Sequence, residues 1–191
     1  MGKISNKKIY GVVICYNSEN TIKDLYDRID KEIFDKVYFF DDNSTDNSYE
    51  IAKNFDWHVV KNQTNLGHGG NLKKAIKSAF TDGADYVLEI HADNQYDPNL
   101  ISKAKNFIDQ DYALIIGSRF VNKNPFRDEE MPFLRYFSNK IMSSLTSKLL
   151  SINLTEFHTG FKIFGRSFYN KINFEDCSNN YLFSFQVILL T

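Results

Sequence analysis

Apolar and polar positions along the chain follow two periods. Short apolar runs have the length of buried strands, whereas apolar residues at Ile22, Leu25, Tyr26 and Ile29 have the spacing of one helix face. The pattern predicts strands at 9–15, 37–40, 57–60, 86–90 and 113–116. It predicts helices between them, around 22–29, 49–55, 72–80 and 100–108.

Strands and helices in this alternating order form a mostly parallel sheet with helices on both faces. The predicted fold is therefore an α/β three-layer sandwich. Beyond it, the polar segment 121–131 predicts a long surface loop, and the helical spacing of apolar residues predicts a helix over 133–150. Segment 181–191 is strongly apolar and has no polar tail. We expect from this that the chain is C-terminally truncated, with a helix or membrane segment following it.

Composition limits the class of protein. A length of 191 residues and a hydrophobic content of 42% are typical of one globular domain. The formal net charge of −1 excludes a nucleic-acid binder that works by bulk positive charge. Two cysteines are too few for a disulfide scaffold or a four-cysteine zinc site, which favours a reducing compartment such as the cytoplasm.

Polar clusters follow five of the predicted strands. In open α/β sheets, ligands bind beyond the carboxyl ends of the strands. A single polar cluster there is also what a strand-to-helix turn favours for structural reasons. Five clusters on one edge predict a ligand site, and they lie at 16–17, 41–43, 65–71, 91–95 and 117–119.

Two of these clusters suit a nucleotide. Asp41 and Asp42 can cap the next helix, or one of them can accept hydrogen bonds from a nucleobase or ribose. The glycine loop at 65–71 lacks the third glycine of a dinucleotide fingerprint and the Lys-Ser/Thr of a phosphate loop. It still offers backbone N–H groups and close approach to a ribose or phosphates. The alternative is a glycine-rich helix entry.

The cluster at 91–95 suits a metal ion. If the chain stays extended, the alternate side chains His91, Asp93 and Gln95 project to one side. A carboxylate between neutral donors suits Mg²⁺ or Mn²⁺, which take their remaining ligands from water and substrate phosphates. The alternative is a polar loop that ends a strand. Arg119, just past the fifth strand, is placed to neutralise a diphosphate.

Six motifs in order carry a resemblance to a known family. They are VVICYNSENTI (12–22), FDDNSTD (40–46), NLGHGGNL (65–72), HADNQYDP (91–98), GSRF (117–120) and HTGFKIF (158–164). Together they resemble the signature of family 2 glycosyltransferases, in the branch of dolichol-phosphate mannose synthases and bacterial polyprenyl-phosphate glycosyltransferases. The resemblance covers about residues 8–170.

This resemblance implies a glycosyltransferase A-type, Rossmann-like fold in a single catalytic domain over 1–191. Residues 8–120 would be its nucleotide-sugar-binding half and 121–191 its acceptor half. It also implies inverting transfer from a UDP- or GDP-sugar. The implied donor-binding residues are Cys15, Tyr16, Asn17, Asp42, Asn65, Gly67, Gly69, Gly70 and Asn71, with Asp42 on the base. Asp93 would hold Mg²⁺ or Mn²⁺ with Gln95 and His91, and Arg119 and Lys162 would face phosphates.

Two departures from the family pattern favour a weaker alternative. His91 stands at the first position of the usual Asp-x-Asp, and Ser18 and Glu19 stand where an acidic residue normally follows Tyr-Asn. The chain could therefore be a catalytically weak nucleotide-sugar-binding domain. A sugar-1-phosphate nucleotidylyltransferase would need a glycine-rich basic loop after the first strand, where this chain has 15–17 (CYN).

The acceptor decides whether a general base is needed. A sugar hydroxyl must lose its proton, and Glu156 and His158 are the base candidates in the second half, although His158 can equally fix a turn. A lipid phosphate is already anionic and needs cations. Arg127, Arg135, Lys162 and Arg166, with the apolar helix 133–150, suit such a lipid at the cytosolic face of a membrane, unless the helix stripe is core. We predict a metal-dependent enzyme with a polyprenyl phosphate acceptor, and a saccharide hydroxyl as the alternative.

Overall fold

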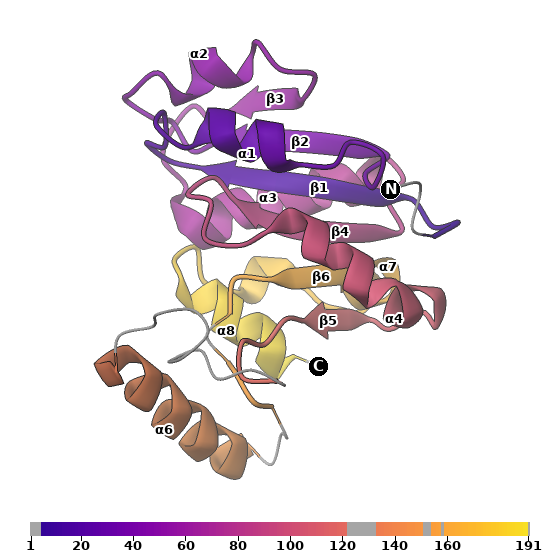
Figure 1. The fold of residues 1–191 in the computed structure, drawn as a ribbon, viewed down its shortest axis with the longest axis vertical. Helices are drawn as coiled ribbons and strands as arrows, with labels where there is room; N and C mark the ends of the chain where they lie inside the picture. The colour runs from indigo at the N-terminus through magenta and orange to yellow at the C-terminus, as the bar shows by residue number, and fades with distance from the viewer. Residues whose placement is uncertain (1–4, 122–132, 151–153, 158, 191) are drawn as a thin grey trace. The chain divides into compact units, whose positions relative to one another are not determined.

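The computed structural model describes residues 5–121, 133–150, 154–157 and 159–190. Among these residues lies a six-stranded sheet with the strand order β3-β2-β1-β4-β6-β5 (Figure 1). Its strands are β1 (Ile9–Cys15), β2 (Lys36–Asp41), β3 (His58–Lys61), β4 (Tyr86–His91), β5 (Leu114–Ile116) and β6 (Lys162–Gly165).

Helices connect the strands in the predicted alternation. They are α1 (Ile22–Arg28), α2 (Ser48–Ala52), α3 (Gly67–Thr81), the 3₁₀-helix η1 (Pro98–Ala104), α4 (Lys105–Asp109), α6 (Phe133–Leu150), α7 (Arg166–Lys171), the 3₁₀-helix η2 (Phe174–Asp176) and α8 (Leu182–Leu189). The chain divides into two compact units. Residues 1–115 and 160–191 form the first unit, and residues 116–159 form the second.

The sheet of the first unit is mostly parallel. β1 pairs in parallel with β2 and β4, and β2 pairs in parallel with β3. Ile14 is in register with Phe40 of β2 and with His91 of β4, so the carboxyl ends of these three strands lie at one edge. β6 runs antiparallel to β4.

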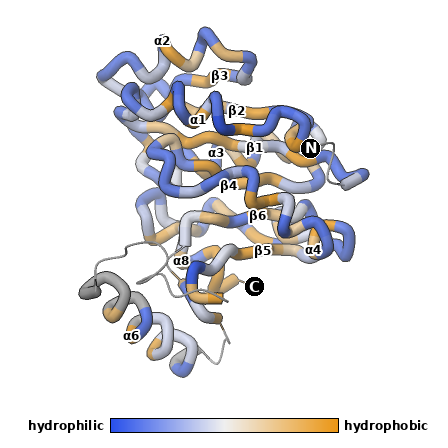
Figure 2. Tube along the Cα trace, viewed as in Figure 1, coloured by the Kyte–Doolittle hydropathy of each residue, from blue (hydrophilic) through white to orange (hydrophobic). Residues whose placement is uncertain are grey.

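The first unit has three layers, because side chains along β1 alternate between two cores. Ile9 and Val13 point into a core shared with α1, η1 and α4. Tyr10 and Val12 point into a second core shared with α3, α7 and α8. Figure 1 shows α1 and α4 on the near side of the sheet and α3 on the far side, and Figure 2 shows the apolar strands between them. The predicted three-layer α/β sandwich is confirmed.

The sequence pattern missed β6, α7, η2 and α8. β6 has only four residues, and the apolar segment at the C-terminal end forms α8, whose Phe183 and Val187 pack with Leu72 of α3 in the second core. No helix among the described residues is both long and apolar enough to cross a membrane. The predicted loop over 121–131 lies outside the described residues apart from Val121.

The second unit is built around α6. Ser143 Oγ accepts a hydrogen bond from the amide of Phe157 at 3.5 Å, and Ser147 Oγ donates to the carbonyl of Leu154 at 3.0 Å. These serines lie on the face of α6 that packs on 154–157. Phe137, Ile141 and Leu145 are spaced four residues apart along the helix and are 52%, 40% and 52% exposed. The alternative that this stripe is ordinary core is therefore wrong for these three residues.

Candidate functional site

A cavity of about 470 Å³ opens at the carboxyl ends of β1, β2 and β4 in the first unit. It brings together nine of the residues predicted for the donor or metal site: Cys15, Tyr16, Asn17, Asp42, Asn65, Gly67, Asn71, His91 and Asp93. Five more residues complete its wall: Ile14, Ser18, His68, Ala92 and Tyr181. Tyr181 comes from the far end of the sequence.

The strand order sets the length of this cavity. Asp42 directly follows β2 and Asp93 follows β4, with β1 between them. Neighbouring strands lie about 4.8 Å apart, so the ends of β2 and β4 are separated by about 10 Å. A carboxylate therefore stands near each end of the cavity.

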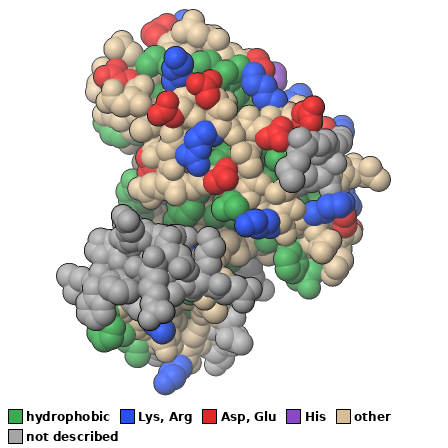
Figure 3. All heavy atoms as spheres, viewed as in Figure 1, with side chains coloured by type: hydrophobic (Ala, Val, Ile, Leu, Met, Phe, Trp, Pro, Cys, Tyr) green, Lys and Arg blue, Asp and Glu red, His purple; other side chains and the backbone are tan. Residues whose placement is uncertain are grey.

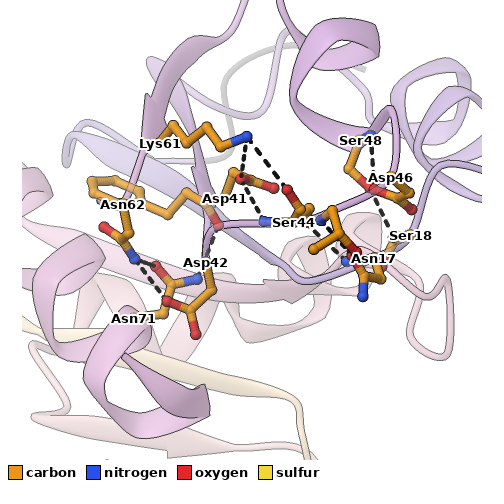
Figure 4. Close-up of polar contacts among 12 residues, drawn as sticks. Asn17, Ser18, Asp41, Asp42, Ser44, Asp46, Ser48, Lys61, Asn62 and Asn71 are labelled. Atoms are coloured by element: carbon orange, nitrogen blue, oxygen red, sulfur yellow. Dashed lines mark hydrogen bonds and ion pairs between the residues drawn. The ribbon is translucent and has the colours of Figure 1, made fainter. Parts of the chain in front are cut away.

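Asparagines form the turns that leave the strands. Asn17, Asn43 and Asn94 have φ angles of 51°, 61° and 62°, a left-handed conformation that asparagine tolerates better than most residues. Asn17 also joins two strand ends, because its Oδ1 accepts the amide of Thr45 at 2.9 Å and its own amide donates to Ser44 Oγ at 2.9 Å (Figure 4). The loops after β1 and β2 are thus one hydrogen-bonded unit.

Asp41 and Asp42 are adjacent but occupy different environments (Figure 4). The Asp41 side chain is fully buried and accepts the amide of Ser44 at 3.0 Å, so it stabilises the turn. Asp42 lies on the cavity wall. Its Oδ1 accepts hydrogen bonds from the Leu66 amide at 2.8 Å and from Asn62 Nδ2 at 2.9 Å. Both bonds use one oxygen, and Oδ2 accepts none from the residues that the structure describes.

A buried amide pair supports Asp42. Asn62 Nδ2 also donates to Asn71 Oδ1 at 2.9 Å, and Asn71 Nδ2 donates to the carbonyl of Phe40 at 2.9 Å. Lys74 Nζ donates to Asn62 Oδ1 at 2.8 Å. The interpretation from sequence missed Asn62, which looked like an ordinary loop residue after a short strand.

The glycine loop has a different use from the one predicted for two of its members. Gly67 lies on the cavity wall, but Gly69 and Gly70 do not. A Cβ on Gly69 would lie 2.5 Å from the Ser178 carbonyl oxygen, and the Gly70 amide donates to the Asn179 carbonyl at 3.0 Å. Gly69 and Gly70 therefore allow segment 178–183 to pack closely on α3, and their predicted place on the donor is corrected.

After His91 the chain does not stay extended. Residues 92–93 form a turn and Asn94 has a positive φ, so Gln95 lies off the cavity wall. Asp93 is exposed on the wall, and its Oδ1 accepts the Gln95 amide at 3.2 Å. The extended geometry predicted for this segment is therefore wrong.

The donor set around Asp93 fits a hard divalent cation held largely by substrate. No three His, Cys, Asp or Glu side chains of the described residues are grouped as a preformed cage. One exposed carboxylate is what Mg²⁺ uses when substrate phosphates and water supply its other ligands, and Mn²⁺ also prefers oxygen ligands. Asp93 can meet that requirement without a second protein carboxylate.

Behind the cavity wall lies a buried carboxylate that the sequence pattern missed. Glu89 of β4 has no exposed side-chain surface. Its Oε1 lies 2.9 Å from His91 Nε2 and 3.7 Å from His68 Nε2, and its Oε2 lies 3.5 Å from Lys162 Nζ. Burial opposes ionisation of Glu89, but Lys162 and the two histidines outweigh it and bring the pKa of Glu89 down to about 2.

This cluster sets the tautomer of His91 and the charge of His68. An ionised carboxylate only accepts hydrogen bonds, so Nε2 of His91 carries the proton donated to Glu89. Nδ1 is then the nitrogen of His91 that a ligand can reach. Burial, which outweighs the attraction of Glu89, lowers the pKa of His68 below its ordinary value and keeps its ring neutral at neutral pH.

Lys162 was predicted to face a phosphate, and the structure corrects this. Its side chain is 0% exposed, and its ammonium is paired with Glu89 between β4 and β6. A buried ammonium needs such a counter-charge because its desolvation is costly. Lys162 therefore stabilises the base of the cavity from behind.

Arg119 and Glu156, predicted for separate roles, bind each other within the second unit. Glu156 Oε2 accepts the Arg119 amide at 2.8 Å, and Oε1 accepts Arg119 Nε at 3.0 Å and also Nη2. The Glu156 side chain is fully buried. A carboxylate held this way is not available as a general base, so that prediction is corrected. The other base candidate, His158, lies outside the described residues.

Burial also makes the thiol on the cavity wall inert. Cys15 is 3% exposed, and its removal from water raises the pKa of the thiol to about 11. Cys15 therefore contributes shape to the wall and has no nucleophilic thiolate at neutral pH.

Comparison with known proteins shows the family of this chain. The family model described as "Glycosyl transferase family 2" matches residues 11–172. The chain belongs to the family 2 glycosyltransferases. Their fold is the glycosyltransferase A-type α/β sandwich, and the chain is accordingly an enzyme of the glycosyltransferase class.

Two individual relatives are similar to this chain in sequence. The chain is 28% identical over 182 residues to the UDP-N-acetylglucosamine–dolichyl-phosphate N-acetylglucosaminyltransferase of Methanococcus voltae, covering 86% of this chain and 72% of that protein. It is 24% identical over 140 residues to the dolichol-phosphate mannosyltransferase of Pyrococcus furiosus, covering 70% of this chain and 38% of that protein.

Similarity to solved structures concerns the fold. Glucosyl-3-phosphoglycerate synthase from Mycobacterium tuberculosis, solved with Mn²⁺, UDP and glucosyl-3-phosphoglycerate, matches 96% of this chain with a TM-score of 0.68 and 16% identity. The family 2 chain described here spans 64% of the length of that structure.

Proposed function

We propose that this family 2 glycosyltransferase moves a sugar from a nucleotide-diphospho-sugar to a polyprenyl or dolichyl phosphate. The observation that carries the proposal is the shared cavity of Asp42, Gly67 and Asp93, with a carboxylate near each end. The name of the Methanococcus voltae relative supports UDP-N-acetylglucosamine as the first donor to test. The name of the Pyrococcus furiosus relative supports a mannose donor as the second, for which we choose GDP-mannose.

The nucleoside is proposed to bind at the β2 end. Asp42 Oδ1 accepts hydrogen bonds from Leu66 and Asn62, which fixes the carboxylate. Its Oδ2 can then accept a hydrogen bond from an N–H of the base. Tyr16 is 52% exposed on the same wall and offers a ring beside the base or ribose. The diphosphate would then extend about 10 Å to the β4 end, toward Asp93.

A divalent cation, Mg²⁺ or Mn²⁺, is proposed to bind at Asp93 with the diphosphate, where it supplies charge stabilisation for the leaving group. His91 can add only its Nδ1, because its Nε2 is held by Glu89. Gln95 contributes its backbone amide, which donates to Asp93 Oδ1 within the turn. The binding of Mn²⁺ with UDP in the similarly folded synthase is consistent with this proposal.

The reaction is a displacement at the anomeric carbon. An acceptor oxygen forms the new bond to this carbon while the bond to the diphosphate breaks, and the electron pair leaves with the diphosphate. A phosphate monoester is mostly ionised near pH 7, since its second pKa is about 6. It therefore attacks without a general base, which agrees with a Glu156 that is already bound to Arg119. Asp42 and Asp93 contribute by fixing the donor in line for attack.

Peripheral contact with a membrane is proposed for α6. Its exposed apolar stripe of Phe137, Ile141 and Leu145 lies beside Lys140 and Lys148, both exposed. An amphipathic helix with apolar residues on the outer face and lysines beside them suits an anionic lipid surface. The proposed location is accordingly the cytosolic face of a membrane.

Transfer into an organic-extractable product tests the proposal. The protein would be incubated with radiolabelled UDP-N-acetylglucosamine or GDP-mannose, polyprenyl phosphate and Mn²⁺. We expect label in the organic phase with one of the donors, and a loss of at least a hundredfold in Asp93→Asn. Asp97→Asn is the matched control, because Asp97 lies off the cavity wall and caps η1. Label found only in water-soluble glycans would support the saccharide acceptor, and nucleotide binding without transfer would support a weak binding domain.

A further inference from the structure

An aromatic side chain from the C-terminal segment lies over the cavity and has no part in the mechanism so far. Tyr181 is 77% exposed and lines the wall. Its ring stacks on that of His68 with centroids 4.6 Å apart and an angle of 21° between the planes. The His68 ring in turn lies 5.5 Å from that of His91. One face of the Tyr181 ring therefore packs on His68, and most of the side chain is exposed to solvent.

The segment that carries Tyr181 is held firmly. A Cβ added to Gly67 or to Gly69 would lie within 2.6 Å of backbone atoms in 178–180, so the start of α3 and segment 178–180 are in direct contact. Asn180 Oδ1 accepts the amide of Leu182 at 2.8 Å, and Gln186 Oε1 accepts the amide of Ser178 at 2.7 Å. Tyr181 is thus fixed at the cavity by its backbone on both sides.

The position of Tyr181 along the cavity indicates what it meets. The series Tyr181–His68–His91 ends at β4, whereas the proposed base-binding residue Asp42 follows β2. A donor whose base lies at Asp42 brings its diphosphate and then its sugar to the β4 end. An open aromatic face attracts the positively polarised C–H edge of a flat partner, and one face of a pyranose presents such C–H groups.

From this arrangement we infer that Tyr181, supported by His68, forms the platform for the sugar ring of the donor and is a specificity-determining residue. The inference rests on the proposed nucleotide-sugar donor. It makes the ring of Tyr181, and not its hydroxyl, the contacting group. It also assigns the sugar subsite to a residue that is far in sequence from every other residue of the cavity wall, the nearest of which is Asp93.

Calorimetric titration of diphosphates and their sugars tests the inference. UDP and UDP-N-acetylglucosamine, and in parallel GDP and GDP-mannose, would be titrated with Mn²⁺ into wild type, Tyr181→Ala, Tyr181→Phe and Leu182→Ala. We expect Tyr181→Ala to weaken the nucleotide-sugar about fivefold while the free diphosphate changes less than twofold. Tyr181→Phe should bind as wild type does. Leu182 is similarly exposed in the same segment but lies off the wall, so its variant should change neither affinity.

Each other outcome overturns the inference. Equal weakening of diphosphate and nucleotide-sugar would assign Tyr181 to the nucleotide or to the fold, and unchanged affinities would remove it from the site. A fall in melting temperature of Tyr181→Ala beyond that of Leu182→Ala would indicate a structural role. Wild-type protein that binds none of the four nucleotides would instead contradict the proposed function itself.

Discussion

At the scale of single residues, Asp42 combines two tasks in one carboxylate. Oδ1 holds the Leu66 amide and Asn62, and Oδ2 is left for a ligand. Replacing the residue with alanine would remove the acceptor of the Leu66 amide and of one N–H of the buried Asn62 side chain, and an unpaired buried donor costs about 1–3 kcal/mol. A test of binding therefore needs the isosteric amide, which keeps one oxygen and loses the charge.

We expect Asp42→Asn to weaken UDP or GDP at least about tenfold, because a hydrogen bond to a charged group contributes about 1.5–3 kcal/mol. The measurement is titration calorimetry with Mn²⁺. Glu19→Gln is the matched control, since Glu19 accepts hydrogen bonds from Asn47 and lies off the cavity wall. Equal affinities for wild type and Asp42→Asn would remove Asp42 from the base.

At the scale of elements, helix propensity and packing predict opposite effects of a substitution at Gly69. Alanine is favoured over glycine in a helix by about 1 kcal/mol, so helix propensity alone predicts that Gly69→Ala stabilises α3. The structure predicts the reverse, because the new Cβ would lie 2.5 Å from the Ser178 carbonyl oxygen and 2.6 Å from Phe183 Cβ. We expect a loss of about 1–3 kcal/mol in the free energy of unfolding.

Urea unfolding measures this loss, with the single tryptophan, Trp57, as the fluorescent probe. Lys77→Ala on the exposed side of α3 is the control and should change stability by less than about 0.5 kcal/mol. A Gly69→Ala protein as stable as wild type would mean that segment 178–183 does not pack on α3 as described.

The pair Glu89–Lys162 joins β4 to β6 through buried charge. Removing one partner leaves the other charge uncompensated, so Glu89→Gln or Lys162→Met should each cost about 3–5 kcal/mol of stability. The double variant should cost clearly less than the sum of the two, as a double-mutant cycle measured by urea unfolding would reveal. Additive losses would contradict the pairing.

The same pair predicts a pH dependence. The pKa of Glu89 is about 2 in the folded protein and near 4.5 in the unfolded chain, so the unfolded state binds more protons between these values. Its contribution of roughly 3 kcal/mol is present above pH 4.5 and is lost as the pH falls toward 2. Unfolding curves at pH 7, 4.5 and 3 should show this loss in wild type and a smaller one in the double variant.

Much of the fold was predictable because its elements repeat local patterns. β1 was predicted with the observed bounds, since its whole length is apolar. Helix 100–108 was predicted as one helix, but Asp97 and Pro98 begin it as a 3₁₀-helix and α4 follows. β6 and α8 were missed because their partners, β4 and α3, lie far earlier in the sequence and leave no local signal.

The candidate site was predictable only for the residues that follow a strand. Residues that follow strands, such as Asp42 and Asp93, could be found from the strand pattern alone. Glu89 and Tyr181 could not, because one lies inside an apolar strand and the other reaches the cavity through tertiary packing. A charged residue within a buried strand is a usable signal, since a buried carboxylate needs a partner. Gly69 and Lys162 were misassigned because a motif does not tell which side of its backbone faces the ligand.

At the scale of the whole molecule, charge and exposed apolar side chains occur on both units, but α6 carries three of these apolar side chains on one helix face. Basic and acidic side chains are interspersed over the first unit on the face shown in Figure 3. On the second unit the apolar stripe of α6 is exposed, whereas Ser143 and Ser147 are turned inward. This reversal of the usual amphipathic order is expected where an apolar partner covers the helix.

We expect the triple variant Phe137→Ser, Ile141→Ser and Leu145→Ser to lose most of its binding to anionic liposomes in a flotation assay. The apolar contact would be removed while Lys140 and Lys148 remain. Leu100→Ser with Phe107→Ser, two exposed apolar residues of the first unit, is the control. Undiminished flotation of the triple variant would show that α6 does not contact the lipid surface.

The packing of segment 178–183 on the glycines of α3 determines when the cavity is completed during synthesis of the chain. The strands and loops of the proposed nucleotide site are translated first, but the wall that includes Tyr181 is completed only after segment 178–183 has been translated. Contacts this distant in sequence form late in folding. A chain interrupted before this segment would thus keep the strand-end part of the cavity and lack the side that Tyr181 forms.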